Sequence, residues 1–198
     1  MKATRKNLIN LAVATALALS APLAAAVDIG VGVSLNTEGG GNGGYGVSLP
    51  LRFGNFSIEP ELSFYHSSQD TTYPASPTNN RTNDDQEYTL ETGIYWRQPV
   101  IPSVEMYVGG RLGYTKYEYS YTYQLSPTNN YTYDSSGYFL GPTLGAEYFF
   151  NKNFSLGLDA SLLYASTSGK QVSAGVVDSS QDRNAIDYQS RARLRFYF

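Results

Sequence analysis

Charged residues of both signs recur along this 198-residue chain at positions that alternate with apolar ones. In a β-strand, alternate residues share one face, so these charges would point to one side of their segments. Arg97, Glu105, Asp28 and Asp187 have this polar parity. So do the residues that we expect to form an interior charge network: Arg52, Glu59, Glu61, Glu91, Arg111, Glu147, Asp159, Arg191, Arg193 and Arg195.

Two interpretations of this network are open. It could form a polar path for ions, or it could be a plug of ion pairs that fills a narrow bore. We favour the plug, because buried charges must be paired. The eight-stranded barrel that the strand pattern predicts below also leaves little room for water. Counted along the segments, Glu61, Asp159 and Arg193 fall at similar heights. Glu91, Arg111 and Arg191 lie slightly above them, and closure of the chain ends would bring Asp28 toward Arg195.

The single histidine, His66, precedes Ser67 and Ser68. A histidine that is oriented by an acid, here Glu87 or Asp85, could activate a hydroxyl nucleophile. These residues are faintly similar to the lipid A deacylases, and they keep a lipid A or phospholipid hydrolase as an alternative. We favour a polar residue at a strand border, and we predict no catalytic residue.

Composition argues against several other functions. Cysteine is absent, which excludes disulfides and thiolate metal sites. Asp84 and Asp85 alone fall short of the roughly six to eight oxygens that calcium takes. The glycines between Gly39 and Gly44 lack the lysine of a phosphate-binding loop. We predict no cofactor and no metal.

The N-terminus has the pattern of a cleavable export signal. Lys2, Arg5 and Lys6 precede an apolar run over 8–19, which is too short to span a bilayer, and Ala24 to Ala26 supply the small residues of a cleavage site. We therefore predict a signal peptide over 1–26 and one domain over 27–198. Without the signal, 11 basic residues face 17 acidic ones, a net charge of −6 that argues against nucleic-acid binding.

The rest of the chain alternates apolar and polar residues with period two, which indicates strands. We predict eight antiparallel strands in an up-and-down barrel, over 27–36, 45–53, 56–66, 87–97, 104–117, 137–150, 154–166 and 184–198. The connections alternate between short turns (54–55, 98–103 and 151–153) and long polar loops (36–44, 67–86, 118–136 and 168–183). Pro50, Pro60 and Pro142 fall inside strands, where we expect bulges or unpaired positions.

The sidedness follows from the small and the aromatic residues. Nine glycines share the polar face, as the tight interior of a small barrel requires. Aromatic residues flank the apolar face at both ends, as in the interfacial girdles of membrane barrels. The predicted girdle includes Phe53, Phe56, Trp96, Tyr88, Tyr114, Tyr138, Phe154, Tyr164 and Tyr188.

Two features mark the long loops. The segment Ser-Pro-Thr-Asn-Asn occurs at Ser76 and again at Ser126, either as a duplicated hairpin or as ordinary turn chemistry. Tyr117, Tyr119, Tyr121 and Tyr123 alternate, and Tyr131 and Tyr133 follow, so the fifth and sixth strands could continue as a hairpin above the membrane. Such a hairpin could recruit partners by β-augmentation, or it could be a collar facing lipid headgroups or sugars.

The signal, the eight alternating strands and the end 191–198, which closes on Phe196 and Phe198, resemble the small OmpA/OmpX-type outer-membrane barrels of Gram-negative bacteria. The resemblance implies that Phe196 and Phe198 form the signal read by the barrel-assembly machinery. It also implies periplasmic termini, extracellular long loops, contact with outer-membrane lipids including lipopolysaccharide, and a monomer. The chain stops at the last strand, so we expect no periplasmic domain.

We therefore predict an outer-membrane barrel with a structural or surface-interaction role, in adhesion or envelope integrity, that meets an extracellular ligand or host surface through its loops. A narrow pore for ions or small solutes is the first alternative, and the lipid hydrolase is the second.

Overall fold

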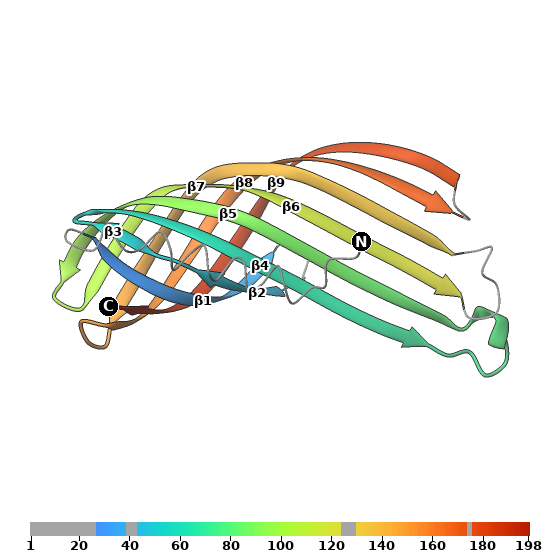
Figure 1. Ribbon diagram of the computed structural model, residues 1–198, viewed down its shortest axis with the longest axis horizontal. Helices are drawn as coiled ribbons and strands as arrows, with labels where there is room; N and C mark the ends of the chain where they lie inside the picture. Colours follow the sequence, from blue (N-terminus) through green and yellow to red (C-terminus); the bar gives the residue numbers. More distant parts are fainter. Residues whose placement is uncertain (1–26, 39–42, 124–129, 174–175) are drawn as a thin grey trace, which may run out of the picture.

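The computed structural model describes residues 27–38, 43–123, 130–173 and 176–198 (Figure 1). The predicted signal peptide, residues 1–26, lies outside the described residues. Across the residues described, no helix has the length and apolar character needed to cross a membrane.

The described chain is almost entirely β-structure. Each strand pairs antiparallel with its neighbours, and β1 also pairs with β9, so the sheet closes into a ring. The elements are β1 (Asp28–Glu38), β2 (Gly43–Ser48), β3 (Leu51–Phe53), β4 (Phe56–Thr71), the 3₁₀ turn η1 (Pro77–Asn79), β5 (Arg81–Ile101), β6 (Val104–Tyr123), β7 (Tyr131–Phe149), β8 (Phe154–Ser173) and β9 (Val176–Tyr197). This arrangement confirms the predicted up-and-down barrel.

The predicted second strand is divided into β2 and β3. Both keep one register against β4, with Ser48 opposite Glu61 and Leu51 opposite Ile58. The interruption falls at Pro50, which has no N–H to donate to the ladder. The nine strands therefore occupy the eight positions around the ring that the sequence predicts.

The other two prolines each interrupt one of their two ladders, as expected. The β7–β8 ladder has a gap between its pairs at Leu140 and Thr143, on either side of Pro142. Pro60 lies opposite the gap between β2 and β3 and has no pair there, although its carbonyl accepts a hydrogen bond from the Leu49 amide at 2.9 Å. On the β5 side, Pro60 stays in register opposite Thr92.

Three of the predicted long loops are largely strand. β4 continues to Thr71, β5 begins at Arg81, and the β8 and β9 ladders run to Ser173 and Val176. β6 and β7 continue as a hairpin, as the alternating tyrosines predict. The predicted boundaries fall short because backbone pairing continues after the side chains of both faces become polar. The turn predicted over 98–103 is also shorter, since β5 runs to Ile101.

The last asparagine of each repeated segment makes the same kind of hydrogen bond. The Oδ1 atom of Asn80 accepts a hydrogen bond from the Tyr73 amide at 2.7 Å. The Oδ1 atom of Asn130 accepts one from the Tyr123 amide, also at 2.7 Å and also seven residues away. The last asparagine of each repeat therefore links the end of the repeat to the chain before it.

The β1–β2 hairpin is much shorter than the others (Figure 1). Pairing of β1 with β9 ends at Glu38 opposite Gln189, and pairing of β2 with β4 ends at Tyr45 opposite Phe64. Beyond this hairpin, β4 to β9 form an open six-stranded sheet, which we call the extension. It comprises residues 65–71, 81–88, 117–123, 131–136, 167–173 and 176–187. The opposite end of the ring, with its short turns, is the turn end.

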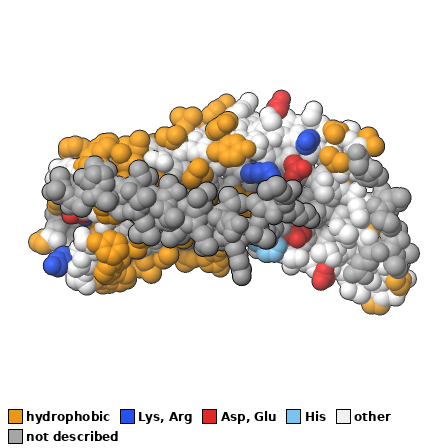
Figure 2. Space-filling model, viewed as in Figure 1, with side chains coloured by type: hydrophobic (Ala, Val, Ile, Leu, Met, Phe, Trp, Pro, Cys, Tyr) orange, Lys and Arg blue, Asp and Glu red, His pale blue; other side chains and the backbone are white. Residues whose placement is uncertain are grey.

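In the closed part of the ring, apolar side chains are exposed and charged side chains are buried, which is the reverse of a water-soluble protein. Val31 and Leu158 are 46% and 60% exposed, whereas Arg193 is 1% exposed. Hydrophobic side chains gather over the closed part, and other side chains dominate the surface of the extension (Figure 2). The apolar residues thus face outward and the charges face the bore, as the sequence predicts.

Candidate functional site: the charge network of the bore

Twelve charged side chains meet inside the ring. β3, β5, β6 and β9 supply six arginines, and β4 to β8 supply six carboxylates, so the formal charges balance. The members are Arg52, Arg97, Arg111, Arg191, Arg193 and Arg195, with Glu59, Glu61, Glu91, Glu105, Glu147 and Asp159. We call this set the lumen network.

The layer nearest the turn end is centred on Glu105. Its carboxylate accepts hydrogen bonds from Arg52 Nη2 at 2.8 Å and from Arg97 Nε at 3.0 Å. Arg97 also bonds Glu147, which lies on β7 and is fully buried. This layer joins β3, β5, β6 and β7.

The next layer is built on Arg195 of β9. Its Nε and Nη2 atoms donate to the two oxygens of Glu59 at 2.9 and 2.8 Å, a bidentate arrangement. Its Nη1 atom lies 3.2 Å from Glu147. Ser48 also donates to Glu59 at 2.9 Å, and Tyr197 donates to Glu147 at 3.0 Å. The neutral hydroxyls therefore bind carboxylate oxygens beside the arginines.

The layer nearest the extension crosses the whole bore. Arg193 bonds Asp159 of β8 and, at 3.0 Å, Glu61 of β4. Arg191 of β9 pairs with Glu91 of β5, which also accepts from Arg111 at 2.7 Å. In an eight-position ring β5 lies directly across from β9, and β4 lies directly across from β8. These ion pairs therefore span the diameter of the bore.

Buried tyrosines fill the space between the charges. The Tyr95 and Tyr107 rings lie 5.1 Å apart, and the Arg97 guanidinium lies 5.0 Å from the Tyr107 ring centroid. The two rings cover Gly93 and Gly145, where an added Cβ atom would collide with them. Sequence reasoning missed these tyrosines, although their parity is that of Arg97 and could have revealed them.

The structure brings together all ten residues of the predicted interior set, along with Arg97 and Glu105, to which the sequence assigns the same polar parity. The expected approach of Asp28 to Arg195 is wrong. Asp28 is exposed and lies opposite Arg52 in the ladder, because the register of β1 and β9 places Gly32 opposite Arg195. Asp187 is exposed as well.

The predicted girdle residues lie on the outside of the ring, and all except the half-buried Phe154 are exposed. Phe154 stacks on Phe150 with centroids 5.3 Å apart. Phe196 and Phe198 are also exposed and contact each other edge to face. Their role as an assembly signal stays a prediction.

His66 lies on the outer face of the extension, with Nδ1 3.3 Å from Asp84 Oδ1. The prediction that Asp85 or Glu87 orients His66 is wrong, because both acids have the opposite parity and face inward. Ser67 faces inward too. Within the described ranges, no group of three or more His, Cys, Asp or Glu side chains is arranged to hold a metal ion.

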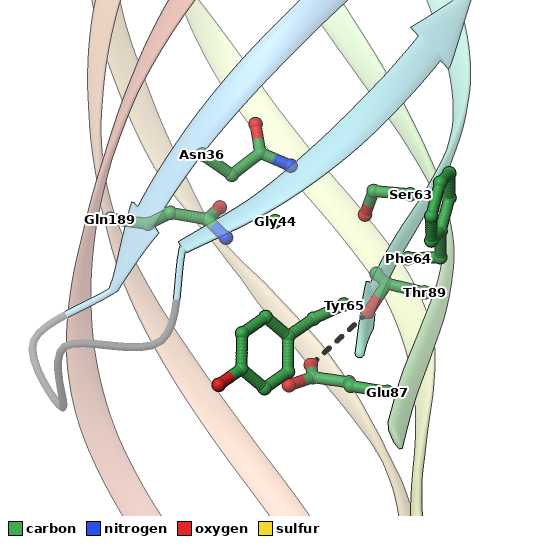
Figure 3. A pocket seen from close by; sticks show the side chains of 8 residues that line it. All are labelled: Asn36, Gly44, Ser63, Phe64, Tyr65, Glu87, Thr89 and Gln189. Carbon is green, nitrogen blue, oxygen red and sulfur yellow. Dashed lines mark hydrogen bonds between the residues drawn. The ribbon is translucent and has the colours of Figure 1, made fainter. Parts of the chain in front are cut away.

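A small polar pocket lies where the bore meets the extension (Figure 3). The Glu87 carboxylate in it accepts hydrogen bonds from Thr115 at 2.9 Å and from Thr89 at 3.3 Å. The pocket has room for about one water molecule. It is lined by Asn36, Gly44, Ser63, Phe64, Tyr65, Glu87, Thr89 and Gln189.

Comparison with solved structures finds similar chains. The chain is similar to a major outer membrane protein from Thermus thermophilus, with 14% identity, a TM-score of 0.63, and coverage of 87% of this chain and 100% of that one. Neisserial surface protein A has 16% identity and a TM-score of 0.47 over 87% and 96% of the two chains. Ail of Yersinia pestis has 14% identity and a TM-score of 0.48 over 86% and 96%.

No curated protein matches the chain. The family model described as the outer membrane protein beta-barrel domain matches residues 9–196. With an apolar exterior, a charged bore and a closed antiparallel ring, the chain belongs to this family of outer-membrane β-barrels.

Proposed function

We propose that this protein is a plugged outer-membrane barrel that presents the extension outside the cell as an interaction surface, with both ends of the barrel domain on the periplasmic side. The observation that carries the proposal is the lumen network, in which Arg191 pairs with Glu91 across the bore and Arg193 joins Asp159 of β8 to Glu61 of β4. A barrel closed in this way leaves the extension as the part available for function.

Strand length supports the orientation. β5 has 21 residues and β9 has 22, whereas a tilted strand crosses a bilayer in about 9–11. Roughly half of each long strand therefore projects beyond the membrane. Outer-membrane barrels have short periplasmic turns and longer extracellular connections, so the extension is assigned to the outside and the turn end to the periplasm.

The alternatives receive less support. A pore needs a continuous water path, which the cross-bore pairs Arg191–Glu91 and Arg193–Glu61 obstruct. A hydrolase needs a nucleophile that is hydrogen-bonded to His66. In the described part of the chain, His66 pairs with Asp84 on an exposed surface, and no such nucleophile is bonded to it.

Cysteine labelling tests the orientation, because the natural chain has no cysteine and single variants give a clean signal. Ser180 is exposed on β9 in the extension, and Lys152 is exposed in the turn between β7 and β8. A membrane-impermeant maleimide should label Ser180→Cys on intact cells, and should label Lys152→Cys only after the outer membrane is permeabilised. The reverse pattern would overturn the proposed orientation.

A further inference from the structure

The inward face of the extension carries a cluster of tyrosines at its centre. Tyr117, Tyr119 and Tyr121 of β6 lie beside Tyr131 and Tyr133 of β7, and we call these five residues the tyrosine floor. Tyr119 stands opposite Tyr133 and Tyr121 opposite Tyr131 in the ladder. They share the parity of the buried Arg111 and Tyr107 on β6, so they face the inside of the curved sheet.

The rings are half-buried and form two contacting groups, Tyr117 with Tyr133 and Tyr119 with Tyr121 and Tyr131. Tyr121 and Tyr131 stack with centroids 5.1 Å apart and an angle of 9° between their planes. Tyr119 lies 6.0 Å from Tyr131, and Tyr117 meets Tyr133 edge to face at 6.4 Å. Burial, together with the hydrogen bond to Tyr131, raises the pKa of Tyr119 to about 12, so its hydroxyl stays protonated.

Polar side chains border this floor on both sides. On the β5 side, Asn83 lies opposite Tyr121 and Asp85 lies opposite Tyr119. On the β8 and β9 side, Gln171 lies opposite Tyr133, and Gln181 lies opposite Gly169 one step further. Among the described residues that lie level with Tyr117 or Tyr119 across the sheet, none of those facing inward is aliphatic.

The floor is open on one side and close to neutral. The short β1–β2 hairpin leaves the wall of the extension incomplete between β4 and β9 (Figure 1). By register, Arg81 and Arg183 face inward together with Asp85, Glu87 and Asp187, so the charges largely cancel. Arg81 is already engaged between the rings of Tyr73 and Tyr121, at 5.6 and 5.0 Å from their centroids.

We propose that the tyrosine floor and its polar borders bind an uncharged oligosaccharide. A pyranose ring has a face of C–H groups that packs on an aromatic ring and an edge of hydroxyls that needs hydrogen-bonding partners. The floor supplies the rings, and Asn83, Asp85, Gln171 and Gln181 supply donors and acceptors. This inference rests on the proposed function, since the floor must lie outside the cell to meet such a ligand.

Other classes of partner fit this surface less well. The centre of a protein interface is usually apolar, and the inward residues described level with Tyr117 and Tyr119 include no aliphatic side chain. A sulfated glycan or a nucleic acid needs an excess of cationic groups, and the inward acids of the extension outnumber its arginines. An uncharged polyhydroxyl chain needs neither.

The test uses the full-length protein in detergent and measures binding of maltohexaose, cellohexaose and chitohexaose by calorimetry. We expect at least one of the three to bind. Tyr133→Ala should weaken that binding about tenfold, because an aromatic ring with no cation on its face is lost, and Tyr133→Phe should stay near the wild type, because it keeps the ring. Tyr138→Ala is the control, since this exposed tyrosine is on the outer face of β7. Heat-dependent gel migration checks that each variant is folded.

Three outcomes would overturn the inference: none of the three sugars binds, Tyr133→Ala binds like the wild type, or only a heparin oligosaccharide binds and does so in a salt-dependent way. None of these outcomes affects the cysteine-labelling result. A failed orientation and a failed ligand are therefore distinguished.

Discussion

Arg193 neutralises two carboxylates on opposite walls of the barrel, and each of them also contacts one further arginine and one hydroxyl group. Asp159 also meets Arg111 at 3.5 Å and the Tyr107 hydroxyl at 3.1 Å, whereas Glu61 keeps Arg191 at 3.4 Å and the Ser34 hydroxyl at 2.5 Å. All these groups are buried. A buried ion pair adds little net stability over apolar packing, but removal of one partner leaves an uncompensated charge.

We therefore expect Arg193→Ala to lower the free energy of unfolding by about 3–5 kcal/mol. The measurement is urea unfolding in detergent, followed by the gel migration of unheated samples. Arg183→Ala is the matched control, because this arginine is exposed in the extension and its loss should leave the midpoint unchanged. Equal midpoints for the two variants would show that the lumen network does not stabilise the barrel.

At the scale of the strands, neighbouring backbones approach so closely at some glycines that no side chain fits. A Cβ atom at Gly109 would collide with the Ile94 carbonyl oxygen of β5, and one at Gly141 would collide with the Leu162 oxygen of β8. Gly110, the next residue, faces outward, and its Cβ would make an ordinary contact of 3.6 Å with the Gly141 oxygen. Position rather than residue type thus decides which glycine is required.

Gly109→Ala should destabilise the barrel by about 1–3 kcal/mol, because β5 and β6 must move apart to admit the methyl group. Gly110→Ala should have little effect or stabilise slightly, since alanine loses less conformational entropy on folding. Thermal scans that monitor strand content would compare the two variants. A larger loss at Gly110 than at Gly109 would contradict the close approach of β5 and β6.

For the whole molecule, closure of the ring and the cross-bore ion pairs act together. The ring has no open edge in its closed part, and its charged groups bond one another across the lumen. Little room remains for a hydrated ion in an eight-position barrel. The protein should therefore fold as a compact membrane barrel without a conducting path.

In planar bilayers the wild-type protein should give no discrete conductance steps. Heat-dependent gel migration of the same preparation serves as the positive control for folding, since a folded barrel stays compact in cold detergent and shifts after boiling. Steps that change when Glu61 or Arg193 is neutralised would instead establish the narrow pore and remove the plug.

The sequence alone determined the sidedness of the barrel and the number of positions around it. Side chains of a strand alternate between two faces with period two, so the parity of Gly93 or Arg111 assigns its face before any partner is known. The glycines of the polar face and the aromatic residues at both ends of the apolar face then placed Val31 and Leu158 outside. It could not define the strand ends, because the backbone ladder of β4 and β5 continues through polar residues that no longer alternate.

Only the tertiary structure decided which charges meet. Arg193 and Glu61 are 132 residues apart, and Arg191 and Glu91 are 100 apart. Their pairing depends on the register at the closing β1–β9 seam, which also separates Asp28 from Arg195. Parity assigns a side chain to one face of its own strand. The level of that side chain along the barrel axis depends instead on the registers of all the strands around the ring.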